Sequence, residues 1–191
     1  VTLAAATTLS GSTIHTQSTL AGGNHALTIT GAADIDGAFT GLASLSVSGT
    51  SIIGSNVTTS GSQTYAGAVT LSGGDRVLTG STVNTQSTLA GGSHALTITG
   101  AADVDGAYSG LTSLSVSGTS NIGANVTTSG SQTYAGAVTL SGGDRTLTGS
   151  TVNTQSTLAG GSNALTITGA ADIDGAFTGL TSLSVSGTSN I

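Results

Sequence analysis

The chain has no cysteine, proline, methionine or tryptophan, and it also has no lysine or glutamate. Without cysteine it can form neither disulfides nor thiolate metal sites, and it has no thiol nucleophile. The absence of proline suits long β ladders, in which every backbone N–H is needed as a donor. Only 5% of the residues are charged, yet 36% are hydrophobic, so enough apolar surface is available for burial to offset the entropy of folding.

Positive charge is almost absent, because Arg76 and Arg145 are the only basic side chains besides three histidines. Eight aspartates bring the net charge to −6. A nucleic acid would find almost nothing to neutralise its phosphates, and an anionic membrane surface would repel the chain. No apolar run approaches the roughly 18 residues of a membrane span. We therefore expect neither a nucleic-acid partner nor a membrane-spanning segment.

The chain is built from a 69-residue repeat. Residues 54–122 and 123–191 are two full copies that differ at six positions, and residues 1–53 are a partial first copy. A fixed long period is typical of solenoids, in which each unit packs on the next. Both ends of the chain fall inside a repeat, so we expect one continuous solenoid that belongs to a longer chain or fibre.

Within each copy, apolar residues alternate with small polar ones, as in Leu27-Thr28-Ile29-Thr30 and in the run QTYAGAVTL from Gln63. This period of two predicts strands with one buried face. Glycine-rich segments between the runs suit corners. No segment has the apolar spacing of a helix. The sequence therefore predicts an all-β protein.

Two all-β architectures fit short strands with regular corners. A sandwich would need hairpins and strands that differ from layer to layer, whereas a parallel β-helix stacks similar coils. The 18-residue step from Leu96 to Leu114, between similar strands, is about one coil. The β-helix is the better fit. Its repeat would hold three coils and rise about 14 Å, or four coils and rise about 19 Å.

The runs QTYAGAVTL, DRTLTGSTV, STLAGG, ALTITG and SLSVSGTS resemble the β-strand repeats of filamentous haemagglutinin-like large exoproteins. The likeness lies in Thr127–Leu140, Asp144–Gly149 and Leu165–Val185, and it extends over nearly the whole chain. It implies a right-handed parallel β-helix, display on the bacterial surface or outside the cell, and an adhesive or structural role.

Three Asp-x-Asp pairs are the candidate metal ligands. Alternate residues of a strand project from the same face, so two carboxylates of a pair could meet one Ca²⁺ ion. The alternative is a pair of solvated corner residues, because calcium usually takes six to eight oxygens. We expect no metal cluster of histidines, since Asn84 stands one repeat after His15. The pairs are Asp34/Asp36, Asp103/Asp105 and Asp172/Asp174.

Two tyrosines, Tyr65 and Tyr134, occupy equivalent positions in successive copies and are candidate contacts for a glycan ring. The alternative is that they fill the core. At another aromatic position, Tyr108 is replaced by Phe177 one repeat later, so the hydroxyl is dispensable there, which favours a core role for that position. We expect no enzyme, because equivalent carboxylate pairs would lie a whole repeat apart, too far to flank one glycosidic bond.

These observations predict a non-enzymatic structural β-solenoid, a segment of a bacterial extracellular fibre, sheath or large surface adhesin. The alternative is a carbohydrate- or receptor-binding adhesin module, whose partner would be a host or cell-surface glycan. The main expected partner is the chain itself, through continuation or end-to-end stacking of solenoid segments. No cofactor is expected other than the candidate calcium.

Overall fold

The computed structural model describes residues 1–191 and contains strands but no helix. No helix that could cross a membrane is therefore present. The strands are β1 (Thr7–Thr16), β2 (Leu20–Ala21), β3 (Ala26–Ile35), β4 (Phe39–Leu42), β5 (Ser44–Val47), β6 (Ser51–Ile53), β7 (Val57–Thr59), β8 (Gln63–Tyr65), β9 (Val69–Leu71), β10 (Arg76–Thr85), β11 (Leu89–Val104), β12 (Tyr108–Val116), β13 (Ser120–Ile122), β14 (Val126–Thr128), β15 (Gln132–Tyr134), β16 (Val138–Leu140), β17 (Arg145–Thr154), β18 (Leu158–Ile173), β19 (Phe177–Val185) and β20 (Ser189–Asn190).

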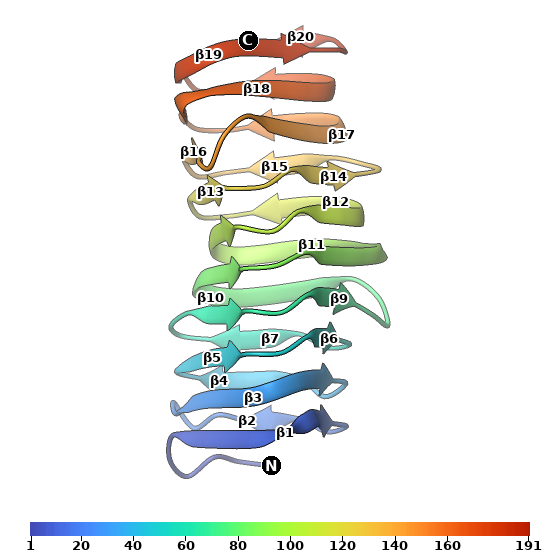
Figure 1. Ribbon diagram of the computed structural model, residues 1–191, viewed down its shortest axis with the longest axis vertical. Coiled ribbons are helices and arrows are strands. Elements are labelled where there is room, and N and C mark those ends of the chain that lie inside the picture. The colour runs from blue at the N-terminus through green and yellow to red at the C-terminus, as the bar shows by residue number, and fades with distance from the viewer.

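The strands stack as the turns of a coil, with β1 at one end and β19 and β20 at the other (Figure 1). Each pairs in parallel with a strand about 19 residues further along, and the chain makes about ten turns. Leu96 pairs with Leu114, so the 18-residue step between these strands is one coil, as expected. The predicted all-β, parallel β-solenoid is confirmed.

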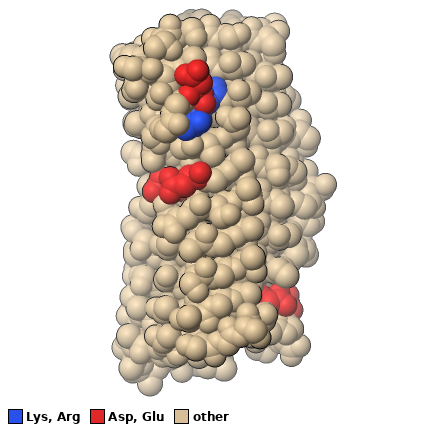
Figure 2. Space-filling view, in the orientation of Figure 1, with Lys and Arg blue, Asp and Glu red and all other residues tan.

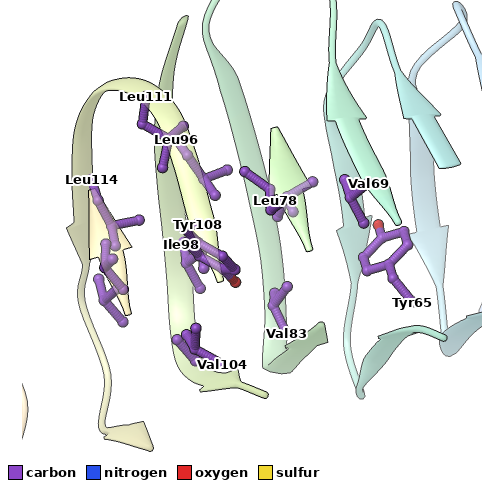
Figure 3. Close-up of a cluster of buried hydrophobic side chains, with 14 of the residues drawn as sticks. Tyr65, Val69, Leu78, Val83, Leu96, Ile98, Val104, Tyr108, Leu111 and Leu114 are labelled. Carbon is purple, nitrogen blue, oxygen red and sulfur yellow. The ribbon is translucent and has the colours of Figure 1, made fainter. Parts of the chain in front are cut away.

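Alternation builds the interior of the coil. In β3, Leu27 and Ile29 are fully buried, whereas Thr28 and Thr30, which alternate with them, face solvent. The same alternation in every turn produces one continuous core that runs from Leu3 to Ile173. Figure 3 shows part of it, with Leu78, Ile98 and other apolar side chains from successive turns gathered inside the coil. The apolar half of each strand is thus removed from water, which is the main stabilising term.

Glycine occupies corners where successive coils come closest. The N–H of Gly118 donates to the carbonyl of Gly100 one turn earlier at 2.9 Å, and Gly49 donates to Gly31 at the same distance. The ladder therefore continues through corners as well as strands. Another such corner, at residues 66–68, divides the run QTYAGAVTL, predicted as one strand, into β8 and β9.

The coil has three faces, because each turn places three β segments in three columns of paired residues. We call these the first, second and third faces. On the first face the partners run Leu9, Ile29, Val47, Tyr65; on the second, Ile14, Ala33, Ser51, Val69; on the third, Leu20, Phe39, Val57, Leu78.

The 69-residue repeat does not fill a whole number of turns. Leu9 lies on the first face, and its equivalents Leu78 and Leu147 lie on the third and the second. From the segment of Leu9 to that of Leu78 the chain advances by eleven segments, which at three per turn is three and two-thirds turns. The repeat is therefore intermediate between the three and four coils expected. At the usual strand spacing it rises about 18 Å.

Equivalent residues of successive copies consequently lie on different faces. Asp34 is on the second face, Asp103 on the first and Asp172 on the third. A given motif returns to the same face only after three copies, or eleven turns, which is about 53 Å along the axis. The visible surface in Figure 2 is mostly uncharged, with its few charged side chains in separate patches at different heights. The fractional turn thus distributes the charges around the rod.

Candidate metal centre

Each Asp-x-Asp pair lies where a strand ends at a corner. In the first copy, Asp34 is in β3 and Asp36 comes directly after it, while Ile35 between them is fully buried. The two carboxylates therefore project from the outer surface together, as alternation predicts. The arrangement recurs around the buried Val104 and Ile173 in the later copies.

In the first copy, the coil brings a histidine onto the pair. His15 in β1 is the register partner of Asp34 one turn on. Its Nε2 lies 2.7 Å from Oδ2 of Asp36 and 3.7 Å from Oδ2 of Asp34. One possible ligand atom from each of the three residues lies within 4.8 Å of those of the other two. All three side chains remain in contact with solvent.

The carboxylates favour the charged form of His15. The hydrogen bond to Asp36 is the largest influence and raises the pKa of His15 above its usual 6.5. Burial has a smaller opposing effect, and the negative charges of Asp34 and Asp36 raise the pKa further. The sequence analysis compared His15 only with its equivalent one repeat later and did not place it beside the Asp pair, because its pairing with residues 19 and 21 positions later depends on the coil register.

Asparagines replace the histidine in the later copies. In the second copy, Nδ2 of Asn84 donates to Oδ2 of Asp103 at 2.6 Å and to Oδ2 of Asp105 at 3.3 Å. Asn121, one turn further, donates to Oδ1 of Asp103 at 2.8 Å. Asp103 thus receives an amide donor on each carboxylate oxygen.

The third copy has the same arrangement around Asp172. Asn153 donates to Oδ2 of Asp172 at 2.7 Å, and Asn190 donates to Oδ1 at 2.8 Å. In the first copy, Ile52 stands where these copies have Asn121 and Asn190. Asp34 therefore lacks the second amide donor, and its carboxylate accepts no hydrogen bond in the structure.

The fold brings no histidine or further carboxylate to the two later pairs, Asp103/Asp105 and Asp172/Asp174. Only the first pair, Asp34/Asp36, has a third potential metal ligand, His15, within 4.8 Å of its carboxylates. Asp105 and Asp174 are exposed, and the backbone N–H of Asp174 donates to the carbonyl of Thr154 one turn earlier at 3.0 Å. Two carboxylates alone fall short of the six to eight oxygens that calcium usually takes. For these two pairs the geometry fits the alternative to the calcium prediction, namely solvated corner residues, of which Asp103 and Asp172 are also held by asparagines.

The two tyrosines proposed for a glycan contact lie inside the core. Tyr65 and Tyr134 have no exposed surface, and Figure 3 shows the Tyr65 ring among the apolar side chains. Burial raises the pKa of both hydroxyl groups far above the usual value. The glycan interpretation of these rings is wrong for this fold, because a sugar cannot reach them without opening the coil.

Tyr65 and Tyr134 are each held by a buried glutamine, which the sequence analysis did not assign to the core. The hydroxyl of Tyr65 donates to Oε1 of Gln63 at 2.9 Å. Nε2 of Gln63 donates to the carbonyls of Val57 and Thr79, at 3.2 and 2.8 Å. Gln132 and Tyr134 repeat the arrangement. The i, i+2 spacing of Gln and Tyr on one strand face was the available signal.

The Asp75-Arg76 and Asp144-Arg145 dipeptides form hydrogen bonds to backbone groups at the corners. Oδ1 of Asp75 accepts the backbone N–H of Ala95 one turn on, at 2.8 Å. Arg76 folds back and donates to the carbonyl of Ser72 through Nε and Nη2, at 2.9 and 2.6 Å. These bonds satisfy backbone groups around the Ser72–Asp75 corner.

Comparison with models of known protein families, with curated proteins and with solved structures finds no match to this chain. The resemblance to filamentous haemagglutinin-like exoproteins therefore stays an expectation from the repeat motifs.

Proposed function

We propose that this chain is a non-enzymatic structural β-solenoid, a segment of a bacterial extracellular fibre, sheath or large surface adhesin. The observation that carries the proposal is the relation between copies. Each 69-residue copy follows the previous one by the same eleven segments, and the strand pairings of β10 with β11 recur between β17 and β18 with the same register and the same bulge. Further copies could extend the rod without interrupting its ladder or its core.

A rod of this kind resists bending because hydrogen bonds and apolar contacts both run along its axis. Successive turns are joined by parallel backbone ladders on three faces, and the core is continuous through the described chain. The proposed partner is the chain itself. An additional copy, in the same chain or in a stacked one, would pair with the outer edge of the last turn as β19 pairs with β18.

The binding-module alternative depended most on aromatic contacts to a glycan, and burial of Tyr65 and Tyr134 removes that support. A structural role requires no exposed aromatic stripe. It requires only a stackable coil and a surface with little charge.

The test is to express chains with two, three and four complete copies and to measure their maximum dimension by small-angle X-ray scattering. Rods that lengthen by about 18 Å per copy, with a 4.8 Å axial reflection in aligned samples, are expected. A control with Ile98→Asp in one internal copy places a charge in the core and should shorten the ordered rod. Particles whose length does not grow with copy number would contradict the proposal.

The cellular location needs its own experiment. An antibody against the chain should label intact, unpermeabilised cells of the organism that encodes it. Labelling only after permeabilisation would contradict an extracellular or cell-surface fibre, while leaving the rod architecture unaffected.

A further inference from the structure

We propose that His15, Asp34 and Asp36 form a binding site for one divalent ion of the zinc class, and that the equivalent positions in the second and third copies do not. The proposal is independent of the structural role above. It assigns to the first copy a property that the otherwise similar copies lack. The donor set is one imidazole nitrogen and two carboxylate oxygens, whose atoms lie within 4.8 Å of one another.

The spacing of the donor atoms suits such an ion. Zinc binds histidine nitrogen and carboxylate oxygen at about 2.0–2.2 Å in tetrahedral geometry, which separates neighbouring ligand atoms by about 3.4 Å. Nε2 of His15 lies 2.7 Å from one carboxylate oxygen and 3.7 Å from the other. Small side-chain rotations, which solvent exposure permits, would bring all three atoms to coordination distance. The fourth position would face water.

The donor chemistry favours zinc-class ions over calcium or magnesium. Calcium and magnesium select oxygen ligands, whereas neutral imidazole suits zinc, nickel and copper. Three protein ligands with an open position are also fewer than calcium usually takes. The calcium site predicted from the Asp pair alone is thus replaced, in this copy, by a mixed nitrogen and oxygen site.

The other two copies provide the contrast within the same chain. There, amide N–H groups point at the carboxylates: Asp103 accepts from Asn84 and Asn121, and Asp172 from Asn153 and Asn190. An N–H donor directed at a carboxylate occupies the place where a cation would approach. In the first copy Asp34 receives no amide donor, because His15 and Ile52 replace the two asparagines. Its carboxylate is available to an ion.

The experiment is a zinc titration of the 191-residue chain by isothermal calorimetry at pH 7.5, with the cobalt(II) absorption spectrum as a second readout. One ion per chain and a tetrahedral cobalt spectrum are expected. His15→Asn installs the residue that the second copy carries on the same backbone, so the fold should persist. We expect this variant to bind at least about 10-fold more weakly, since even outer-shell partners contribute that much.

The matched control is His94→Asn, which also exchanges a histidine for the residue found one repeat later, Asn163. It should leave zinc binding unchanged. The gain-of-site variant Asn84→His with Asn121→Ile copies the first site into the second copy and should raise the stoichiometry to two. Circular dichroism of each variant separates loss of binding from loss of folding.

Three results would overturn the proposal. They are the absence of zinc binding by the folded chain, equal affinity in the His15→Asn variant, and a stoichiometry of three, which would place the ions at the Asp pairs irrespective of histidine. Calcium binding with affinity equal to that of zinc would also contradict the nitrogen-containing site. Affinity should fall as the pH is lowered, because protons compete with the ion for Nε2.

Discussion

The corner glycines offer a sharp test of how closely the coils stack. Gly100 has φ +128°, and a Cβ atom placed on it would lie 1.8 Å from the carbonyl oxygen of Gly80 in the preceding turn. Gly143 has nearly the same backbone conformation, φ +124°, but a Cβ there would meet nothing within 4 Å. Alanine at the two positions therefore shares the same backbone strain and differs in steric contact.

The expected magnitudes follow from these two contributions. Positive φ costs an alanine about 1–2 kcal/mol, and the reduced entropy of the unfolded chain offsets about 0.4–1 kcal/mol of it. Gly143→Ala should thus destabilise the fold by about 1 kcal/mol. Gly100→Ala must also push two coil backbones apart, and overpacking costs about 1–3 kcal/mol more. We expect a total of about 2–4 kcal/mol for Gly100→Ala.

The measurement is thermal unfolding followed by circular dichroism at 218 nm, with urea unfolding as a second method. At about 2–4 °C per kcal/mol for a chain of this size, Gly100→Ala should lower the Tm by about 4–16 °C and Gly143→Ala by only about 2–4 °C. Equal shifts for the two variants would refute the reasoning, because they would show that coil contact at Gly100 contributes nothing.

Further predictions concern buried hydroxyl groups and His15. Tyr65→Phe removes the donor to Oε1 of Gln63 inside the core and should cost about 1–3 kcal/mol in urea unfolding; an unchanged midpoint would contradict that bond. In the third copy Oγ1 of Thr154 is buried without a partner, whereas its equivalent in the second copy bonds to a tyrosine hydroxyl. Phe177→Tyr should supply that partner and stabilise the chain by about 1 kcal/mol, and destabilisation would count against it. The pKa of His15 is raised in the folded chain, so its ion pairs stabilise the fold fully below about pH 6.5 and this stabilisation is lost as the pH rises through the raised value. The Tm difference between the metal-free chain and its His15→Asn variant should therefore shrink between pH 6 and pH 9, and a difference that grows would contradict the assigned ion pair.

The metal candidate shows where sequence reasoning reached its limit. Alternation correctly placed Asp34 and Asp36 together on the outer surface, because that depends only on neighbours along one strand. It did not place His15 beside them, because the distance between residues 15 and 36 depends on the length of the intervening coil. The same holds for Asn84 and Asp103, whose hydrogen bond crosses from one turn to the next.

The prediction that the two tyrosines contact a glycan was wrong for a related reason. In the segment QTY, the polar Gln63 and the amphipathic Tyr65 lie on the same strand face. This short strand has no aliphatic residue on that face to identify it as the buried one. Tertiary packing decided the matter, since the carbonyls of Val57 and Thr79 and the Tyr65 hydroxyl satisfy the glutamine amide inside the coil. A buried amide is acceptable only where such partners are present.

The sequence by itself determined the 69-residue period, the all-β character, the parallel coil and the glycine corners. These follow from local alternation and from identity between copies. Only the tertiary structure decided that a copy spans three and two-thirds turns. The reason is that coil length varies with each corner. It is 18 residues between Val47 and Tyr65 but 21 between Val57 and Leu78, where the Ser72–Asp75 corner adds length. The sum of those lengths sets the face on which every motif lies.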